Sequence, residues 1–502
     1  MNPPRPRSAW HSPLLRLLLV TALAVCVHGY HLGTDDGAIY VPGIKQVADP
    51  ALYPFGAEFF QSHARLSAFS LLVGGSARLT HLSVDWVILA WYVAGVFLLL
   101  LAAWNLLCAL FETDSARWGG IALLAAAFCV PVAGTALAIA DPYVTSRTLS
   151  TPATIFAIAC FVSGQRKQAA VWWLCTALLH PQMGFYLALF IACLAVTTRR
   201  APVRVGHAPA ADIAGLSVLP FIFEFQPARG PAREALLSRT YFFVSQWAWY
   251  EWIGVFAPLA LLGWLSTADL RGARPALRPL ARTLVVFGLL CTLAGIVLTL
   301  SPRLENYSRL QPMRALHLVY VIFFLLLGAC VGEYALRRHV WRWLALFAVL
   351  AVSGVLLQNS TYPASAHVEW PGAASPNRWC DAFLWIRGNT PKNAVFALDP
   401  AYMLLPGEDM HGFRAIAERS MLADAVKDSG AVSLFPGLAA EWKAQVQSAH
   451  GWKQFQLPDF ERLAGLYPVT WFVTELPAPA GLPCPYRNQA VAVCRLPTVT
   501  AR

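Results

Sequence analysis

The sequence predicts a polytopic α-helical membrane protein that ends in a smaller α/β domain outside the bilayer. Apolar stretches recur from about residue 13 to about residue 358, and many approach the roughly 20 residues that cross a hydrocarbon core. Residues 359–502 contain no comparable run and are rich in turn-forming Pro and Gly. With 57% hydrophobic and only 13% charged residues in a chain of 502, the composition excludes an ordinary soluble enzyme.

The first domain, residues 1–358, is expected to hold about eleven spans. We place them at about 13–31, 84–111, 119–140, 152–164, 168–180, 183–198, 211–226, 250–267, 283–301, 315–334 and 341–358. Several are short, which predicts tilted or broken helices. The first run also fits a cleaved signal peptide, but "VCVHGYHLG" offers no small-x-small cleavage site, so a retained anchor is favoured.

The basic residues of the connecting loops give the orientation. If the N-terminus with Arg5 and Arg7 is cytoplasmic, the loops richest in Lys and Arg all fall inside. Residues 32–83 are then an external first loop, and 359–502 form a periplasmic domain on the inner membrane. The net charge of +11 is therefore explained by the orientation of the chain in the membrane. No basic patch interleaved with exposed aromatics is visible, which argues against a nucleic-acid partner.

The same topology places several polar residues on one side of the membrane. Asp35, Asp36, Asp141 and His180 all fall at the outer ends of predicted spans. Residues 34–37 are all turn formers, so a turn explains one acid. Two adjacent carboxylates repel, so at least one gains from a cation, a phosphate-bound metal or a nearby Arg. The sequence is compatible both with a turn and with a binding site at this acidic pair.

Outer loops should be poor in Arg, yet they hold many: Arg147, Arg229, Arg233, Arg239, Arg303, Arg309 and Arg314. The planar, permanently charged guanidinium suits phosphate oxygens, which predicts a lipid phosphate or pyrophosphate as ligand. Contact with membrane lipid headgroups, or ion pairing with Glu234 and Glu305, is the alternative.

Aromatic side chains surround Glu251 in "FFVSQWAWYEWIG". A belt at the membrane interface accounts for the rings but not for the acid. A carboxylate among aromatics is also how proteins often hold a sugar ring, so Glu251 is a candidate substrate-binding residue, as is Tyr40 of the first external loop.

An acidic pair in the first external loop, about eleven spans and an external C-terminal domain together resemble the GT-C superfamily of integral membrane glycosyltransferases. The segments "DPALYPF", "DPYVTSRTLSTP", "WAWYEWIGVFAPL", "RLQPMRALHL" and "GFRAIAERSMLADAVKD" are similar to an uncharacterised bacterial family of GT-C-like membrane proteins. The narrower resemblance spans most of the chain and implies a fold with almost no biochemistry.

The superfamily resemblance implies a sugar donor carried on a polyprenyl phosphate. It implies Asp35 or Asp36 as catalytic base and external basic residues as phosphate binders, namely Arg147, Arg303, Arg309 or Arg314. A single displacement assisted by a carboxylate base would invert the configuration at the anomeric carbon. The acceptor motif WWDxG is absent, which removes support for asparagine glycosylation. Asp141 stands alone in the second external loop, so a divalent metal is only weakly supported as a cofactor, and no acceptor is named.

Two other classes of function remain open. A transporter or translocase of a lipid-linked substrate also needs many spans, but it usually carries charges at the bilayer midplane and internal repeats, whereas here the charges cluster at the outer edge. A GT-C-like scaffold without catalysis, acting as an assembly partner, is the other, because a fold alone does not fix an activity.

The tail reads as alternating strands and helices. Strands are predicted at 393–400, 468–476 and 489–496, and helices at 412–424 and 438–455. If the tail lies outside the cytoplasm, Cys484 and Cys494 can close a short disulfide loop.

Overall fold

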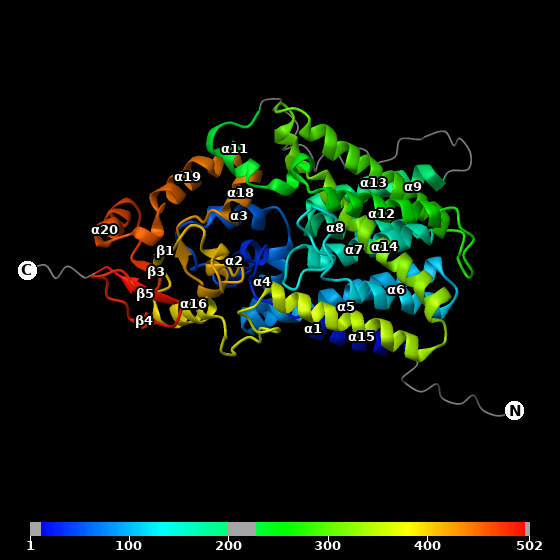
Figure 1. The fold of residues 1–502 in the computed structure, drawn as a ribbon, viewed down its shortest axis with the longest axis horizontal. Helices are drawn as coiled ribbons and strands as arrows, with labels where there is room; N and C mark the ends of the chain where they lie inside the picture. Colours follow the sequence, from blue (N-terminus) through cyan, green and yellow to red (C-terminus); the bar gives the residue numbers. More distant parts are fainter. Residues whose placement is uncertain (1–11, 199–226, 497–502) are drawn as a thin grey trace, which may run out of the picture.

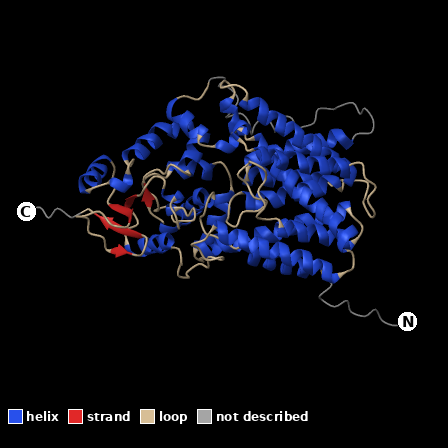
Figure 2. Ribbon diagram, viewed as in Figure 1, coloured by secondary structure: helices blue, strands red, loops and turns tan. Residues whose placement is uncertain are grey.

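The computed structural model describes residues 12–198 and 227–496. Within them the chain is mostly helical, and strands occur only at one end of the molecule (Figure 2). A bundle of long helices forms the other end (Figure 1). The coarse class predicted from the sequence, apolar helices followed by a small sheet, is therefore confirmed.

The bundle is built from α1 (Pro13–His28), α5 (Val84–Leu110), α6 (Asp114–Ala126), α7 (Arg147–Val162), α8 (Arg166–Leu179), α9 (Pro181–Thr198), α12 (Trp249–Leu265), α13 (Leu277–Thr299), α14 (Leu316–Cys330), the π-helix η7 (Val331–Leu336) and α15 (Val340–Thr361). Five segments of the described chain are long and apolar enough to cross a membrane: Val84–Leu110, Pro181–Thr198, Leu277–Thr299, Glu305–Leu336 and Val340–Thr361.

The expectation of about eleven full-length spans is thus not met. Helices α1, α7 and α12 are apolar but have only 16, 16 and 17 residues. At about 1.5 Å per residue they are shorter than a hydrocarbon core of roughly 30 Å. The predicted span 211–226, and the N-terminal Arg5 and Arg7, lie outside the described residues.

The predicted span at 119–140 is wrong. Helix α6 ends at Ala126, and residues 127–146 form an irregular, largely buried loop. Its backbone bonds to itself: the Val132 amide donates to the Leu137 carbonyl at 2.8 Å, and the Ile139 amide donates to the Val130 carbonyl at 3.1 Å. Such internal pairing satisfies a backbone that has left the helix.

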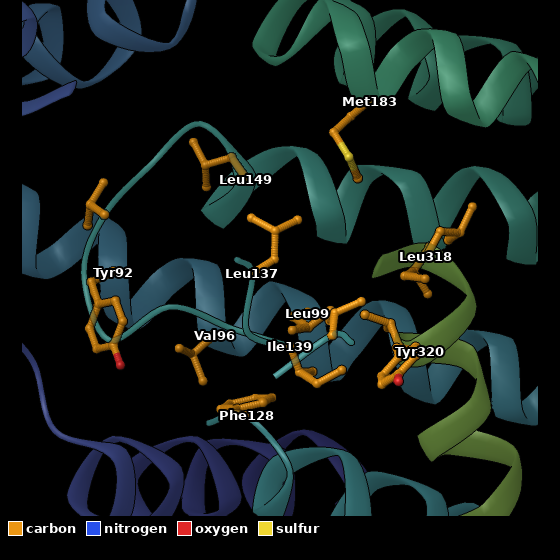
Figure 3. Packing of buried hydrophobic residues seen from close by; sticks show 14 of the residues in the cluster. Tyr92, Val96, Leu99, Phe128, Leu137, Ile139, Leu149, Met183, Leu318 and Tyr320 are labelled. Atoms are coloured by element: carbon orange, nitrogen blue, oxygen red, sulfur yellow. The ribbon is translucent and has the colours of Figure 1, made fainter. Parts of the chain in front are cut away.

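Apolar side chains of this loop complete the core of the bundle (Figure 3). Phe128, Leu137 and Ile139 are each at most 6% exposed and belong to one cluster with side chains of α5, α7, α9 and α14. The loop is apolar because it is buried by neighbouring helices. Composition alone could not distinguish that environment from lipid.

Short helices follow α1 and lie between the bundle and the sheet (Figure 1). They are α2 (Gly37–Ala48), α3 (Glu58–Arg65) and α4 (Phe69–Thr80), and they occupy the predicted external first loop. Helix α2 packs against both α3 and α4 and also against α17 (Phe413–Ala417) of the C-terminal region. Residues far apart in the sequence are therefore brought together here.

The C-terminal region carries a five-stranded mixed sheet in the order β2-β1-β3-β5-β4. The strands are β1 (Val395–Ala397), β2 (Ser420–Met421), β3 (Trp471–Glu475), β4 (Tyr486–Arg487) and β5 (Val491–Arg495). Strand β1 is parallel to β2 and β3, and β5 is antiparallel to β3 and β4. The three predicted strands contain β1, β3 and β5, and Cys484 and Cys494 form the predicted disulfide.

The helices of this region are α16 (Arg378–Asn389), α17, α18 (Asp428–Leu434), α19 (Ala439–Ser448) and α20 (Leu457–Leu466). The predicted helix 412–424 is wrong beyond Ala417. Glu418 takes a left-handed conformation with φ 54°, which ends the helix, and β2 then pairs with β1.

Short elements complete the chain: α11 (Gly230–Leu237), η3 (Thr240–Phe242), η4 (Val244–Gln246), η5 (Glu305–Leu310), η6 (Pro312–Ala315), η8 (Tyr402–Leu404), η9 (Pro436–Leu438) and η10 (Trp452–Gln454). Elements α11, η5 and η6 matter for the site because they carry outer-loop arginines, and Arg239 directly precedes η3.

Candidate functional site

The acidic pair lies in the tight segment between α1 and α2, and the C-terminal region holds this segment in place. The Asp35 amide donates to the Met410 carbonyl at 2.9 Å, and the Gly412 amide donates to the Gly33 carbonyl at 2.9 Å. Asp35 itself is left-handed, with φ 49°, a conformation that Asp tolerates better than most residues. The turn predicted around Asp36 is therefore present, and it is anchored from outside.

Gly33 permits the close approach of the two regions. Its φ of 70° favours glycine, and a Cβ there would lie 2.5 Å from the Cβ of Ala415. Any larger residue would push the acidic segment away from α17.

Glu369 fastens the same segment with its side chain. Its Oε2 accepts from the Leu32 amide at 2.8 Å, and its Oε1 lies 2.8 Å from His411 Nε2 and 3.3 Å from His31 Nδ1. His411 Nδ1 donates to the Glu408 carbonyl at 2.8 Å. Because both ring nitrogens of His411 face acceptors, its imidazole is held as a cation, and the pKa of His411 is raised despite burial.

Arg147, the first residue of α7, bridges two of the predicted acids. Its Nη2 lies 3.1 Å from Asp36 Oδ2 and 2.8 Å from Asp141 Oδ2, and its Nε lies 3.2 Å from the same Asp141 oxygen. The guanidinium is only 8% exposed and the Asp141 side chain 9%. Arg147 was predicted to bind phosphate, but its fork is used by protein carboxylates.

Lys427 closes the other side of the acidic pair. It precedes α18, and its ammonium contacts the Asp35 carboxylate and lies 3.3 Å from Asp36 Oδ1. The Tyr143 hydroxyl donates to Asp35 Oδ2 at 3.1 Å. The side chain of Lys427 is 10% exposed, whereas Asp35 is 42% exposed. Each of the two adjacent carboxylates thus has a cation, as the repulsion argument required.

Charge and burial set the protonation of these acids in opposite directions. Burial would raise the pKa of Asp36, but Lys427, Arg147 and Arg314 outweigh it and lower that pKa. Burial dominates at Asp141 and raises its pKa, although Arg147 opposes the shift. Burial alone would lower the pKa of Lys427, but the two carboxylates raise it. Asp36 and Lys427 are therefore both charged at neutral pH.

A cavity of about 950 Å³ opens beside Asp36. Its wall carries more cations than acids: Arg65, Arg147, Arg239, Arg309, Arg314 and Lys427, against Asp36 and Glu58. Apolar side chains line the rest, among them Leu66, Leu179, Phe185, Phe242, Leu310, Leu434, Phe435 and Leu438. A concave site of this composition suits a ligand with an anionic group and a hydrocarbon portion.

Arg239 and Arg314 of this wall have no carboxylate partner among the described residues. The Arg314 guanidinium lies 4.6 Å from the ring centre of Tyr241, and its Nε donates to the Thr135 carbonyl at 3.4 Å. Arg239 donates to the Val426 carbonyl, next to Lys427. Both keep donor capacity that an anionic ligand can use.

Neutral polar groups line the same wall near Asp36. Tyr40 receives a hydrogen bond from the Ser146 hydroxyl at 3.1 Å. Burial lowers the pKa of His63 to about 4 and that of His180 to about 3. At neutral pH both imidazoles are therefore uncharged and can donate or accept a hydrogen bond from a hydroxyl-rich ligand.

The cavity wall includes six of the predicted residues: Asp36, Tyr40, Arg147, His180, Arg309 and Arg314. Asp35 adjoins it through Lys427, and Asp141 lines a small neighbouring cavity with Arg147. The structure does not bring Glu251 or Arg303 to this wall. Glu251 Oε2 instead accepts from the Ala248 amide at 2.6 Å and caps α12, and Arg303 is exposed on a turn before η5.

The ion-pairing alternative holds for Arg233. Arg233 pairs with Glu305 at 2.9 Å. Glu234 pairs instead with Lys443 of α19, at 2.6 Å. Arg233 is thereby removed from the set of ligand-binding candidates.

Sequence reasoning missed Lys427 and His63. Lys427 lies 391 positions from Asp36. It belongs to the segment "GFRAIAERSMLADAVKD" that carries the family resemblance, but nothing in that segment points to the acidic pair. A weak signal existed for His63, because it belongs to the external segment that contains the acidic pair.

No group of three or more His, Cys, Asp or Glu side chains in the described part of the chain could hold a metal ion. The Asp35, Asp36 and Asp141 carboxylates are engaged by Lys427 and Arg147 instead.

Comparison of the chain with protein-family models found no match, and comparison with curated proteins also found none.

Proposed function

We propose that the protein is a membrane glycosyltransferase that transfers a sugar from a polyprenyl-phosphate donor to an acceptor of the cell envelope. One observation carries the proposal: the ionised carboxylate of Asp36 faces a cavity that is lined by Arg239, Arg314 and apolar side chains. Neither arginine has a carboxylate partner among the described residues. An acid for a hydroxyl proton, cations for a phosphate and a hydrocarbon surface for a polyprenyl chain are the three features that this reaction needs.

We place the cavity at the outer face of the inner membrane, with the N-terminus cytoplasmic and residues 359–502 periplasmic. The clustering of the basic loops at one end of the bundle supports this orientation. Phe111 pairs with Ala273, and the Arg271 amide lies 2.5 Å from the Tyr334 hydroxyl. The loops with Arg271 and Arg337 therefore meet, which is the arrangement of a cytoplasmic face.

The chemistry proposed is a single inverting displacement. An acceptor hydroxyl near Asp36 attacks the anomeric carbon of the donor as the bond from that carbon to the phosphate oxygen breaks. The acceptor proton passes to the carboxylate, and the phosphate leaves with the bonding electron pair. Arg314 and Arg239 stabilise the charge that grows on the phosphate. Uncharged His63 and His180 are placed to orient sugar hydroxyls.

The test is replacement of the acids in the full-length protein. We expect Asp36→Asn to reduce sugar transfer by roughly 100-fold or more, in line with the loss of a general base, and Asp35→Asn to reduce it less. Transfer is measured in proteoliposomes with a panel of polyprenyl-phosphate sugars, together with membrane insertion of each variant. Glu251→Gln, away from the cavity, is the control. Full activity in both aspartate variants contradicts the proposal.

A further inference from the structure

The acids of the cavity come from the N-terminal region, but one of their cations comes from the C-terminal region. Lys427 faces Asp35 and Asp36, while the remaining cation in direct contact with them among the described residues is Arg147, which Asp141 shares. Without Lys427, Asp36 and Asp141 would share the Arg147 guanidinium, and Asp35 would have no cation in direct contact among the described residues. The chain as it stands therefore relies on Lys427 to balance the acidic pair.

The turn that carries Lys427 is itself rigidly held. The Val426 and Lys427 amides donate to Asp424 Oδ1 at 2.8 and 2.5 Å. The Asp424 amide donates to Asp428 Oδ2 at 2.9 Å, and Arg414 forks onto Asp428 at 2.9 and 3.0 Å. Such a network fixes the backbone from which the lysine extends. The fold of the C-terminal region therefore determines the position of the ammonium.

We infer that Lys427 is a positioning residue of the proposed transfer reaction: its ammonium holds the Asp35 and Asp36 carboxylates in place and oriented toward the cavity, so that the C-terminal domain completes the site. The inference rests on the proposed function for its catalytic meaning. The ion pair that it describes can be tested without that function.

Other charged and titratable groups face the same acids. They would determine the electrostatic environment of these acids after Lys427 is removed. They are Arg147 and Asp141 at the start of α7 and in the preceding loop, Tyr143 of that loop, Arg314 of η6, His63 of α3, Tyr40 of α2 and Tyr362 after α15. Arg239, before η3, acts on Lys427 itself. Burial would raise the pKa of Asp36, and the charge of Lys427 lowers it together with those of Arg147 and Arg314.

The first experiment is a double-mutant cycle on the thermal unfolding of the full-length protein in detergent. Lys427→Met is made in the wild-type background and in an Asp35→Asn, Asp36→Asn background. We expect the variant to lower the melting temperature in the wild type and to leave it almost unchanged without the acids. An equal drop in melting temperature in both backgrounds would show that Lys427 does not stabilise the protein through the two acids.

The second experiment separates positioning from other roles. In the transfer assay, we expect Lys427→Met to lower kcat with little change in KM and to move the acid limb of the pH profile to higher pH. Lys427→Arg should restore much of the rate. A rise in KM alone, or a rate loss without a pH shift, overturns the positioning role. Absence of transfer by the wild-type protein overturns the proposed function instead, while the cycle still decides the ion pair.

Lys392 provides the matched control. It also belongs to the C-terminal region and also pairs with an acid of the first loop segment, Asp49, at 2.8 Å, but it is 65% exposed and lies away from the cavity. Lys392→Met should lower the melting temperature only slightly and leave the rate and the pH profile unchanged.

Discussion

At the scale of single residues, the structure divides the predicted arginines by what they already contact. Arg147 is committed to Asp36 and Asp141, and Arg233 to Glu305. Arg314 lines the cavity without a carboxylate partner among the described residues, and Arg303 lies exposed elsewhere. The same residue type, in loops of similar composition, therefore has different roles that only the partners reveal.

Replacing Arg314 by Met should weaken donor binding. Hydrogen bonds to charged groups contribute about 1.5–3 kcal/mol, so we expect KM for the polyprenyl-phosphate sugar to rise by roughly 10- to 100-fold. Arg303→Met, which removes an exposed arginine of the same loop, should leave KM unchanged. Steady-state transfer measured against donor concentration distinguishes the two. Equal KM values in both variants would assign the phosphate to other cations.

At the scale of elements, the segment between α1 and α2 depends on Glu369 for its position. Burial would raise the pKa of Glu369, but His411 and His31 lower it to about 2 from an ordinary 4.5. A depressed carboxyl pKa stabilises the folded protein above the unfolded value, and this contribution is lost as the pH falls from about 4.5 toward 2. The acidic pair should therefore loosen in acid before the bundle does.

Glu369→Gln tests this dependence. We expect the variant to be less stable at neutral pH and to lose less of its remaining stability between pH 4.5 and 2 than the wild type does. Hydrogen exchange of residues 30–36 should rise in the variant at pH 7, since the Leu32 amide loses a charged acceptor. Glu461→Gln, exposed on α20, is the control. Unchanged exchange in residues 30–36 would mean that the backbone bonds to Gly412 and Met410 suffice.

The elements also show how far the sequence could be interpreted. Residues 84–111 were predicted as a span almost to the residue, because a long uniform apolar run has few alternatives. Residues 119–140 are similarly apolar, but their helix ends at Ala126 and residues 127–140 form a loop, because packing against α5, α7 and α14 can bury apolar side chains as well as lipid can. The adjacent acids marked the site, whereas Lys427 could not be found without a contact across 391 residues.

At the scale of the whole molecule, a second charge network joins the N-terminal and C-terminal regions. Lys45 of α2, 1% exposed, lies 2.7 Å from Asp85 of α5 and 2.9 Å from Glu418. Arg387 of α16 contacts the same two acids at 2.6 and 3.1 Å. The network contains two acids and two cations, so its charges balance in a buried setting, which is the condition for a buried ion pair to be tolerated.

Lys45→Met should therefore destabilise the contact between the two regions. It leaves two acids on one guanidinium, and breaking a buried pair from one side costs about 3–5 kcal/mol. Lys392→Met breaks an exposed pair between the same regions and should cost at most about 1 kcal/mol. Thermal unfolding in detergent compares the two. Because α2 also follows the acidic pair, Lys45→Met should increase hydrogen exchange around Asp36 as well. A loss of stability without that increase would mean that the acidic segment is held by Glu369 and Lys427 independently of this network.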